Sequence, residues 1–246
     1  MTRKEIRIQA VTFDFWGTLY QNRDVEPIRL ALLREGINHP GRHKLDEKLV
    51  PAYEYAHQLA HNRWRKEQRT TPAAERLDAT LDYLGISVSP SVRAELARGL
   101  EETLLRRPPN PSPGVYRLLQ ALRELGVRIG LISDTGITPG RVLRQIMARD
   151  GLLPFFQHCT FSDEVGRAKP HPLPFRHTLE ALKVEALAAT HIGDLPGTDI
   201  VGAKGVGMRA VLFTGVTDPQ EEVDLADGLL ASYEDLETAL RVLDGG

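Results

Sequence analysis

Two hydrophobic patterns divide the chain. Between about residues 24 and 107, leucine, tyrosine and tryptophan recur at helical spacing in a polar background rich in arginine, glutamate, histidine and alanine. This spacing predicts amphipathic helices over about residues 25–35, 45–68, 73–84 and 90–105. Pro72 and Pro90 stand near two of the helix starts, where proline is tolerated, and Gly36 and Gly85 stand where helices would end.

The rest of the chain alternates short β-branched and apolar runs with helical patterns. Strands are expected over residues 6–13, 127–133, 158–162, 190–194 and 209–214. Helices are expected over residues 115–125, 138–149, 172–182 and 233–243, and a further helix opens over residues 199–204. Such alternation predicts a parallel sheet with helices on both faces. The predicted fold class is α/β, with a Rossmann-like three-layer core and an inserted all-helical domain.

A proline-rich connector separates the two patterns. Residues 106–114 read RRPPNPSPG, which fits neither a helix interior nor a central strand. The first strand finds no partner in the helical stretch, so we expect it to pair with the later strands. The predicted division is therefore an α/β core of residues 1–20 and 108–246, with a helical domain of residues 21–107 inserted after the first strand.

Composition argues against several classes of protein. The chain has 31 basic and 33 acidic side chains and a formal charge of -2, which argues against nucleic-acid binding through a broad basic field. Its apolar runs are shorter than the roughly 18–20 residues of a membrane-spanning helix, and its N-terminus lacks the cleavage site of a secretory signal. We expect a cytoplasmic monomer or homodimer with no nucleic-acid or membrane partner.

Polar side chains stand where the predicted strands end. They are Asp14, Ser133, Asp134, Asp194 and Asp199, together with Lys169 in the loop after the third strand. Ligands of parallel α/β sheets bind beyond the carboxyl ends of the strands, so these side chains are expected to converge. Crowded carboxylates are costly unless a cation neutralises them, and oxygen ligands favour Mg²⁺. The sequence therefore predicts a magnesium site at this edge.

Four segments resemble motifs of the haloacid dehalogenase superfamily of hydrolases. They read DFWGTL at residues 14–19, ISD at 132–134, GRAKPHP at 166–172 and GDLPGTD at 193–199. Each follows or ends a predicted strand, in the order that the family shows. The resemblance covers roughly residues 6–20 and 108–246, and the helical stretch lies where this family inserts a mobile cap.

The resemblance implies a magnesium-dependent hydrolase of small phosphorylated metabolites. Asp14 would be the nucleophile that forms an aspartyl-phosphate, Ser133 would hydrogen-bond a phosphoryl oxygen, and Lys169 would offset charge. The implied metal ligands are Asp14, the backbone carbonyl of Trp16, Asp194 and Asp199. The implied substrate-binding positions are Trp16, Gly17, Thr18 and Asp134. The expected partner is a small-molecule phosphate ester.

Trp16 departs from the family pattern. Family phosphatases usually carry an aspartate two residues after the nucleophile, which protonates the leaving group and later activates water. The chain is therefore either a phosphohydrolase that is slow or uses another base, a metal-independent 2-haloacid dehalogenase-like hydrolase, a phosphonate-cleaving relative, or a non-catalytic phosphate-binding member. Dehalogenases carry an aromatic residue at this position but lack the metal motif, which is intact at Asp194 and Asp199. A phosphonate-cleaving relative would need a cap lysine.

Two histidines share one face of the second predicted helix. His57 and His61 are four residues apart, but the glutamate that zinc metalloproteases place beside the first histidine is missing. We expect a solvated or cap-facing pair, with a substrate contact as the alternative.

Overall fold

A computed structural model describes residues 8–37, 42–216 and 223–245 of the chain. Within these residues, six strands form one fully parallel sheet in the order β3-β2-β1-β4-β5-β6. The strands are β1 (Ala10–Phe13), β2 (Arg128–Ser133), β3 (His158–Phe161), β4 (Ala189–Gly193), β5 (Arg209–Phe213) and β6 (Gly228–Leu230). The predicted parallel sheet is confirmed, and β1 pairs with β2 and β4 as expected.

Several boundaries differ from the predicted ones. Strand β1 begins at Ala10, and residues 6 and 7 of the predicted strand lie outside the described residues. Residue 162, predicted to end the third strand, instead begins the short helix α7 (Ser162–Val165). The sequence pattern does not predict strand β6, because a three-residue strand with a single buried residue leaves too little periodicity to detect.

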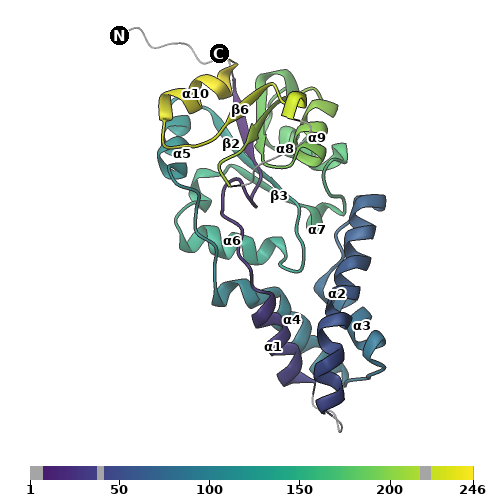
Figure 1. Cartoon of the computed structure of the whole chain (residues 1–246). Coiled ribbons are helices and arrows are strands. Elements are labelled where there is room, and N and C mark those ends of the chain that lie inside the picture. Colours follow the sequence, from purple (N-terminus) through teal and green to yellow (C-terminus); the bar gives the residue numbers. More distant parts are fainter. Residues whose placement is uncertain (1–7, 38–41, 217–222, 246) are drawn as a thin grey trace.

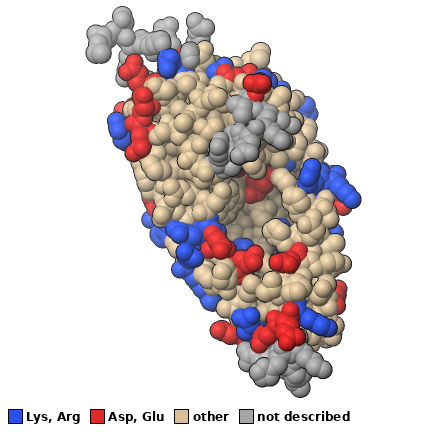
Figure 2. Space-filling model, in the orientation of Figure 1, with Lys and Arg blue, Asp and Glu red and all other residues tan. Residues whose placement is uncertain are grey.

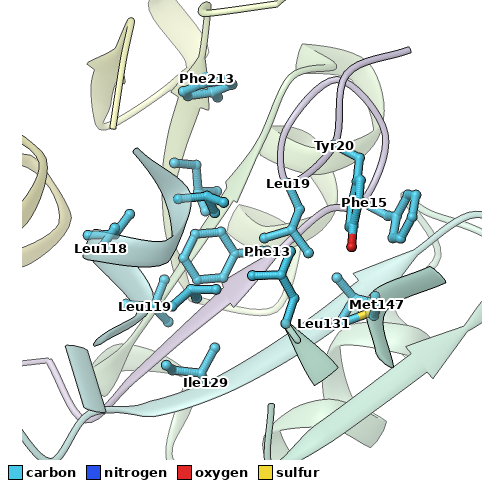
Figure 3. Close-up of a cluster of buried hydrophobic side chains, with 14 of the residues drawn as sticks. Phe13, Phe15, Leu19, Tyr20, Leu118, Leu119, Ile129, Leu131, Met147 and Phe213 are labelled. Carbon is cyan, nitrogen blue, oxygen red and sulfur yellow. The ribbon is translucent and has the colours of Figure 1, made fainter. Parts of the chain in front are cut away.

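Helices cover both faces of the sheet and complete the predicted three layers (Figure 1). Helices α5 (Val115–Glu124), α6 (Gly140–Arg149) and α10 (Leu236–Asp244) contribute to one core cluster, and α8 (Pro172–Leu182) and α9 (Val201–Gly205) contribute to the other. The alternation of a strand divides the side chains between these clusters: Val11 and Phe13 belong to the first and Ala10 to the second. Figure 3 shows Phe13 among leucines of α5 and β2 in the first cluster.

Helices α1 (Glu26–Gly36), α2 (Arg42–Glu67), α3 (Ala73–Leu84) and α4 (Pro90–Arg106) lie between β1 and β2 along the chain. They have their own apolar cluster, which includes Leu33, Leu49, Leu77, Leu96 and Leu100. The predicted helical insertion is confirmed. Among the described helices, none combines the length and the apolar character needed to cross a membrane.

The end of α2 connects the helical insertion to the sheet. The amide of Ala168 donates a hydrogen bond of 2.7 Å to the carbonyl of Gln68, and the hydroxyl of Thr70 donates one of 3.1 Å to the carbonyl of Thr135. Figure 2 shows the surface hollowed between the α/β part and the helical part, with acidic side chains at the margin of the hollow. The insertion therefore forms one side of a cleft at the sheet edge.

Candidate functional site

The cleft lies where the strand order reverses. Strands β1 and β4 are neighbours at the centre of the sheet, and the chain proceeds outward from them in opposite directions. In open α/β sheets, this switch point leaves a crevice at the carboxyl ends of the strands. Asp14 follows β1 directly and Asp194 follows β4 directly, so the topology brings the two carboxylates together.

Three buried carboxylates meet at this crevice. Asp14, Asp194 and Asp199 each offer an oxygen, and these oxygens lie within 4.8 Å of one another. Asp199 stands on a single π-helical turn, Pro196–Ile200, and the amide of Leu195 donates a hydrogen bond of 3.0 Å to its Oδ2. The close approach requires glycine at position 193, because a Cβ there would lie 2.2 Å from the Cγ of Asp199.

Lys169 joins two of the carboxylates. Its Nζ lies 2.5 Å from Oδ1 of Asp14 and 2.6 Å from Oδ1 of Asp199, and it donates a third hydrogen bond of 3.0 Å to the carbonyl of Ile132. Burial acts to lower the pKa of Lys169, but the two carboxylates outweigh it and hold the pKa above its ordinary value. The lysine is therefore charged at neutral pH.

His191 is a buried member of the cluster that the sequence did not reveal. Its Nε2 lies 3.1 Å from Oδ1 of Asp199, and its Nδ1 lies 2.8 Å from the hydroxyl of Thr12. Burial lowers the pKa of His191, so the ring is neutral at pH 7. Because an ionised carboxylate can only accept, the ring donates from Nε2 and accepts from Thr12 at Nδ1. Its only signal in the sequence is a histidine within an apolar strand.

The cluster has more negative charge than the lysine can offset. Three carboxylates face one ammonium and a neutral imidazole. Burial, supported by Asp199 and Asp194, raises the pKa of Asp14 well above its ordinary value despite Lys169. Burial acts to raise the pKa of Asp199 too, yet Lys169 and His191 hold it below its ordinary range. A cation would relieve this imbalance, and an oxygen-only donor set suits a hard ion such as Mg²⁺.

Two adjoining cavities open beside the cluster. The first, of about 220 Å³, is the carboxylate cavity; its walls include Asp14, Asp194, Asp199, Lys169 and Asn22. The second, of about 310 Å³, is the arginine cavity; its walls include Arg23, Arg29, Arg76, His57 and His61. Trp16, Trp64 and Asp134 line both cavities, so the two spaces share a wall.

Asp134 lies at the junction of the cavities and is held from two sides. Its Oδ1 accepts a hydrogen bond of 2.9 Å from the amide of Lys169, and its Oδ2 accepts one of 3.0 Å from the indole of Trp64. Burial raises the pKa of Asp134, which Lys169 only partly offsets. Asp134 therefore links the loop that carries Lys169 to helix α2.

Three residues expected at the site line neither cavity. Ser133 is buried and its hydroxyl lies 3.3 Å from the carbonyl of Asp134. Gly17 has a φ of +65° and packs so closely on Asp194 that a Cβ would lie 2.1 Å from its Oδ2. Thr18 is fully buried. Asp14, Trp16, Asp134, Lys169, Asp194 and Asp199 do converge on the carboxylate cavity, and substrate contacts of the other three stay predictions.

Curated relatives of the chain include phosphatases. A glyceraldehyde 3-phosphate phosphatase of Pyrococcus abyssi is 42% identical over 101 residues, which are 41% of each chain. A phosphoglycolate phosphatase of Rhodospirillum rubrum is 32% identical over 123 residues, which are 50% of this chain and 48% of the relative. The matches therefore span half or less of these relatives, and the relatives' substrates are not assigned to this chain by similarity.

Solved structures and a family model extend the similarity over most of the chain. The Bacillus subtilis HAD-hydrolase YfnB bound to magnesium superimposes with a TM-score of 0.68 at 20% identity, over 96% of this chain and 100% of that one, which shows a shared fold. The model of the haloacid dehalogenase-like hydrolases matches residues 8–207. The chain therefore belongs to the family of haloacid dehalogenase-like hydrolases.

Proposed function

We propose that the protein is a magnesium-dependent phosphatase of small phosphorylated metabolites. The observation that carries this proposal is the buried cluster of Asp14, Asp194, Asp199 and Lys169 beside the carboxylate cavity. The phosphatase names of the curated relatives support the same class of substrate. The dehalogenases of this family do not use a metal ion, so three carboxylates that a cation would neutralise favour a phosphatase.

In this proposal, a carboxylate oxygen of Asp14 attacks the phosphorus, and the bond from phosphorus to the ester oxygen breaks. The alcohol leaves, and water then attacks the aspartyl-phosphate to release phosphate and regenerate the Asp14 carboxylate. Lys169 stabilises the negative charge shared by Asp14 and the transferring group. Ser133 would donate a hydrogen bond to a phosphoryl oxygen, while Gly17 and Thr18 would contribute substrate contacts from the loop after β1.

Asp14, Asp194, Asp199 and the backbone carbonyl of Trp16 would hold Mg²⁺. When bound, the ion shields the anionic nucleophile from the anionic substrate and stabilises charge on the transferring oxygens. The pKa of Asp14 is raised in the absence of the ion. A bound dication would lower this pKa and so favour the ionised nucleophile. His191 keeps Asp199 oriented through the hydrogen bond from Nε2.

Trp16 shapes the leaving-group side of the site rather than supplying an acid. The indole lines both cavities and packs edge-on against Phe15 at 4.8 Å between ring centroids. Its indole N–H is too weak an acid to protonate the departing oxygen, so the alcohol must take its proton from solvent or another group. We expect slow turnover of esters with basic leaving groups, because general acid catalysis contributes typically 10²–10⁴-fold.

We further propose that residues 1–20 and 108–246 act as the hydrolase core and residues 21–107 as a mobile cap. The insertion lines the cleft and meets the core through hydrogen bonds that include those from Trp64 and Thr70. A cap that opens would admit substrate, and closure would exclude water from the aspartyl-phosphate until transfer is complete.

A time course with p-nitrophenyl phosphate tests the proposed function, with and without Mg²⁺ and with nitrophenol and phosphate measured separately. This leaving group needs little protonation, so the missing acid should slow its release least. We expect steady, Mg²⁺-dependent release of both products and none from Asp14→Asn. Full activity of Asp14→Asn would overturn the mechanism. Chloride release from a 2-haloacid without Mg²⁺ would instead support dehalogenation, and phosphate binding without turnover would support a non-catalytic role.

A further inference from the structure

The arginine cavity carries strong positive charge. Arg23, Arg29 and Arg76 line it together with His57 and His61, and among the described residues of its wall the only acid is Asp134. That carboxylate is already held by the indole of Trp64 and the amide of Lys169. Outside the cavity wall, the exposed Glu26 is the acid that acts on His57.

The arginines of this wall have no carboxylate partner among the described residues. Arg29 donates from Nη2 to the hydroxyl of Thr138 at 3.1 Å, and its Nε is buried without an acceptor. Arg76 donates from Nε to the carbonyl of Thr71 at 3.1 Å. Burial, with a contribution from Arg29, lowers the pKa of Arg76 to about 10, so the guanidinium is charged at neutral pH.

Some other arginines of the helical insertion form ion pairs. Arg93 donates from Nε and Nη2 to the two carboxylate oxygens of Asp78, and Arg63 pairs with Glu75. These pairs are on the surface, where water already solvates the charge. Arg29 and Arg76 are instead clustered in a partly buried space without counter-ions, which costs free energy unless an anion enters.

The arginines lie where the alcohol portion of a bound phosphate ester would be. The arginine cavity adjoins the carboxylate cavity across Trp16, Trp64 and Asp134. A phosphoryl group beside Asp14 would therefore place its alcohol portion at the shared wall, facing the arginines. The cavity volume of about 310 Å³ suits a small organic group.

We propose that the arginine cavity binds a second anionic group, carried by the alcohol portion of the substrate. The inference rests on the proposed phosphatase function and narrows its substrate class to phosphate esters of small hydroxy acids or to small bisphosphates. A carboxylate and a second phosphate share the chemistry that a guanidinium fork recognises. Esters of uncharged alcohols would leave Arg29 and Arg76 without a counter-ion.

Three esters with the same two-carbon portion test this inference. They are 2-phosphoglycolate, 1,2-ethanediol bisphosphate and 2-hydroxyethyl phosphate, whose alcohol portion has no charge, compared by kcat/KM in the presence of Mg²⁺. We expect the wild-type protein to prefer 2-phosphoglycolate or the bisphosphate over 2-hydroxyethyl phosphate by roughly tenfold or more, since hydrogen bonds to charged groups are the stronger ones. The ester with the larger preference identifies the group as carboxylate or phosphate.

Variants that remove a charge then test whether Arg29 and Arg76 cause the preference for a second anionic group. Arg76→Gln and Arg29→Gln should each reduce it roughly tenfold or more, and Arg76→Lys, which keeps the charge, should retain part of it. Arg65→Gln is the matched control, because Arg65 is an exposed arginine of α2 that lines neither cavity. Thermal unfolding of each variant establishes that it is folded.

The inference is overturned if the wild type prefers neither 2-phosphoglycolate nor the bisphosphate over 2-hydroxyethyl phosphate, or if Arg65→Gln reduces the preference as much as Arg76→Gln does. If no phosphate ester is hydrolysed, the proposed function has failed, and calorimetric binding of 2-phosphoglycolate still tests the cavity. Weaker binding by Arg76→Gln than by the wild type would support it, and equal affinity would overturn it.

Discussion

The indole nitrogen of Trp64 on α2 lies 3.0 Å from Oδ2 of Asp134 at the end of β2. This hydrogen bond crosses from the helical insertion to the sheet, seventy positions away in sequence. The other oxygen of the same carboxylate accepts from the amide of Lys169. The Asp134 side chain thus couples the insertion to the loop that carries the buried lysine. A substitution on α2 can therefore affect the carboxylate cluster although the substituted residue does not contact it.

Trp64→Phe should loosen this connection while keeping an aromatic ring. Asp134 is half-buried, so an acceptor left without a donor destabilises the closed arrangement by at most about 1–3 kcal/mol. We expect faster hydrogen exchange at the amide of Ala168, which donates to the carbonyl of Gln68 across the same boundary. An unchanged exchange rate at that amide would show that the indole does not hold the insertion in place.

Gly17→Ala should damage the site more than its backbone strain explains. A Cβ at this position would meet the carboxylate of Asp194 at 2.1 Å, and φ is +65°. Gly126→Ala is the matched control, because φ is +77° there and nothing lies within 4 Å of the added atom. Each variant carries a strain of about 1–2 kcal/mol. Only Gly17→Ala should also weaken the thermal stabilisation that Mg²⁺ confers, and equal effects in both variants would contradict the proposed placement of the ion.

Lys169→Met should leave Asp14 and Asp199 without their buried cation. Removing one partner of a buried ion pair costs about 3–5 kcal/mol, so unfolding should occur at much lower denaturant concentration. Saturating Mg²⁺ should restore part of the loss. The control is Lys204→Met, since Lys204 forms an exposed pair with Asp227 at 2.8 Å and should cost about 1 kcal/mol or less. Similar losses in the two variants would argue against a stabilising role for the buried lysine.

Trp16→Asp should restore a general acid if the missing proton donor limits the rate. Hydrolysis of alkyl phosphates should then rise more than that of aryl phosphates, because alkoxides are the poorer leaving groups. Trp16→Asn is the control, since it has the same size as aspartate but cannot transfer the proton. A folded Trp16→Asp with no selective gain would show that another group already protonates the alcohol or that the site needs the indole.

His191 should make the protein sensitive to acid. Burial lowers its pKa, so the unfolded chain takes up a proton below about pH 6.5 while the folded ring stays neutral. The contribution of His191 to stability is thus present above that pH and is lost as the pH falls, by up to about 1.4 kcal/mol per pH unit. Chemical unfolding at pH 7.5 and 5.5 with a chelator should show a smaller pH dependence for His191→Gln. Identical slopes would contradict a neutral buried ring.

Much of the α/β core could be predicted from local sequence patterns. The sequence alone places Asp14 and Asp194 together, because each follows a predicted strand and parallel strands end at one edge. Strand β6 could not be predicted from three residues. The role of His191 could not be predicted either, since its partner Thr12 is distant in sequence and its partner Asp199 lies on a separate helical turn.

Periodicity and motif order in the sequence by themselves determined the parallel α/β core, the helical insertion and the edge at which the carboxylates gather, since strand alternation and strand ends are local properties. Only the tertiary structure distinguished Arg29 and Arg76 from the many arginines on the surface of the insertion. An amphipathic helix carries arginines on any polar face, and packing against the sheet decides which of them lose water and counter-ions. Helix packing likewise brought Trp64 to Asp134, because contacts between the insertion and the core depend on how whole helices are seated.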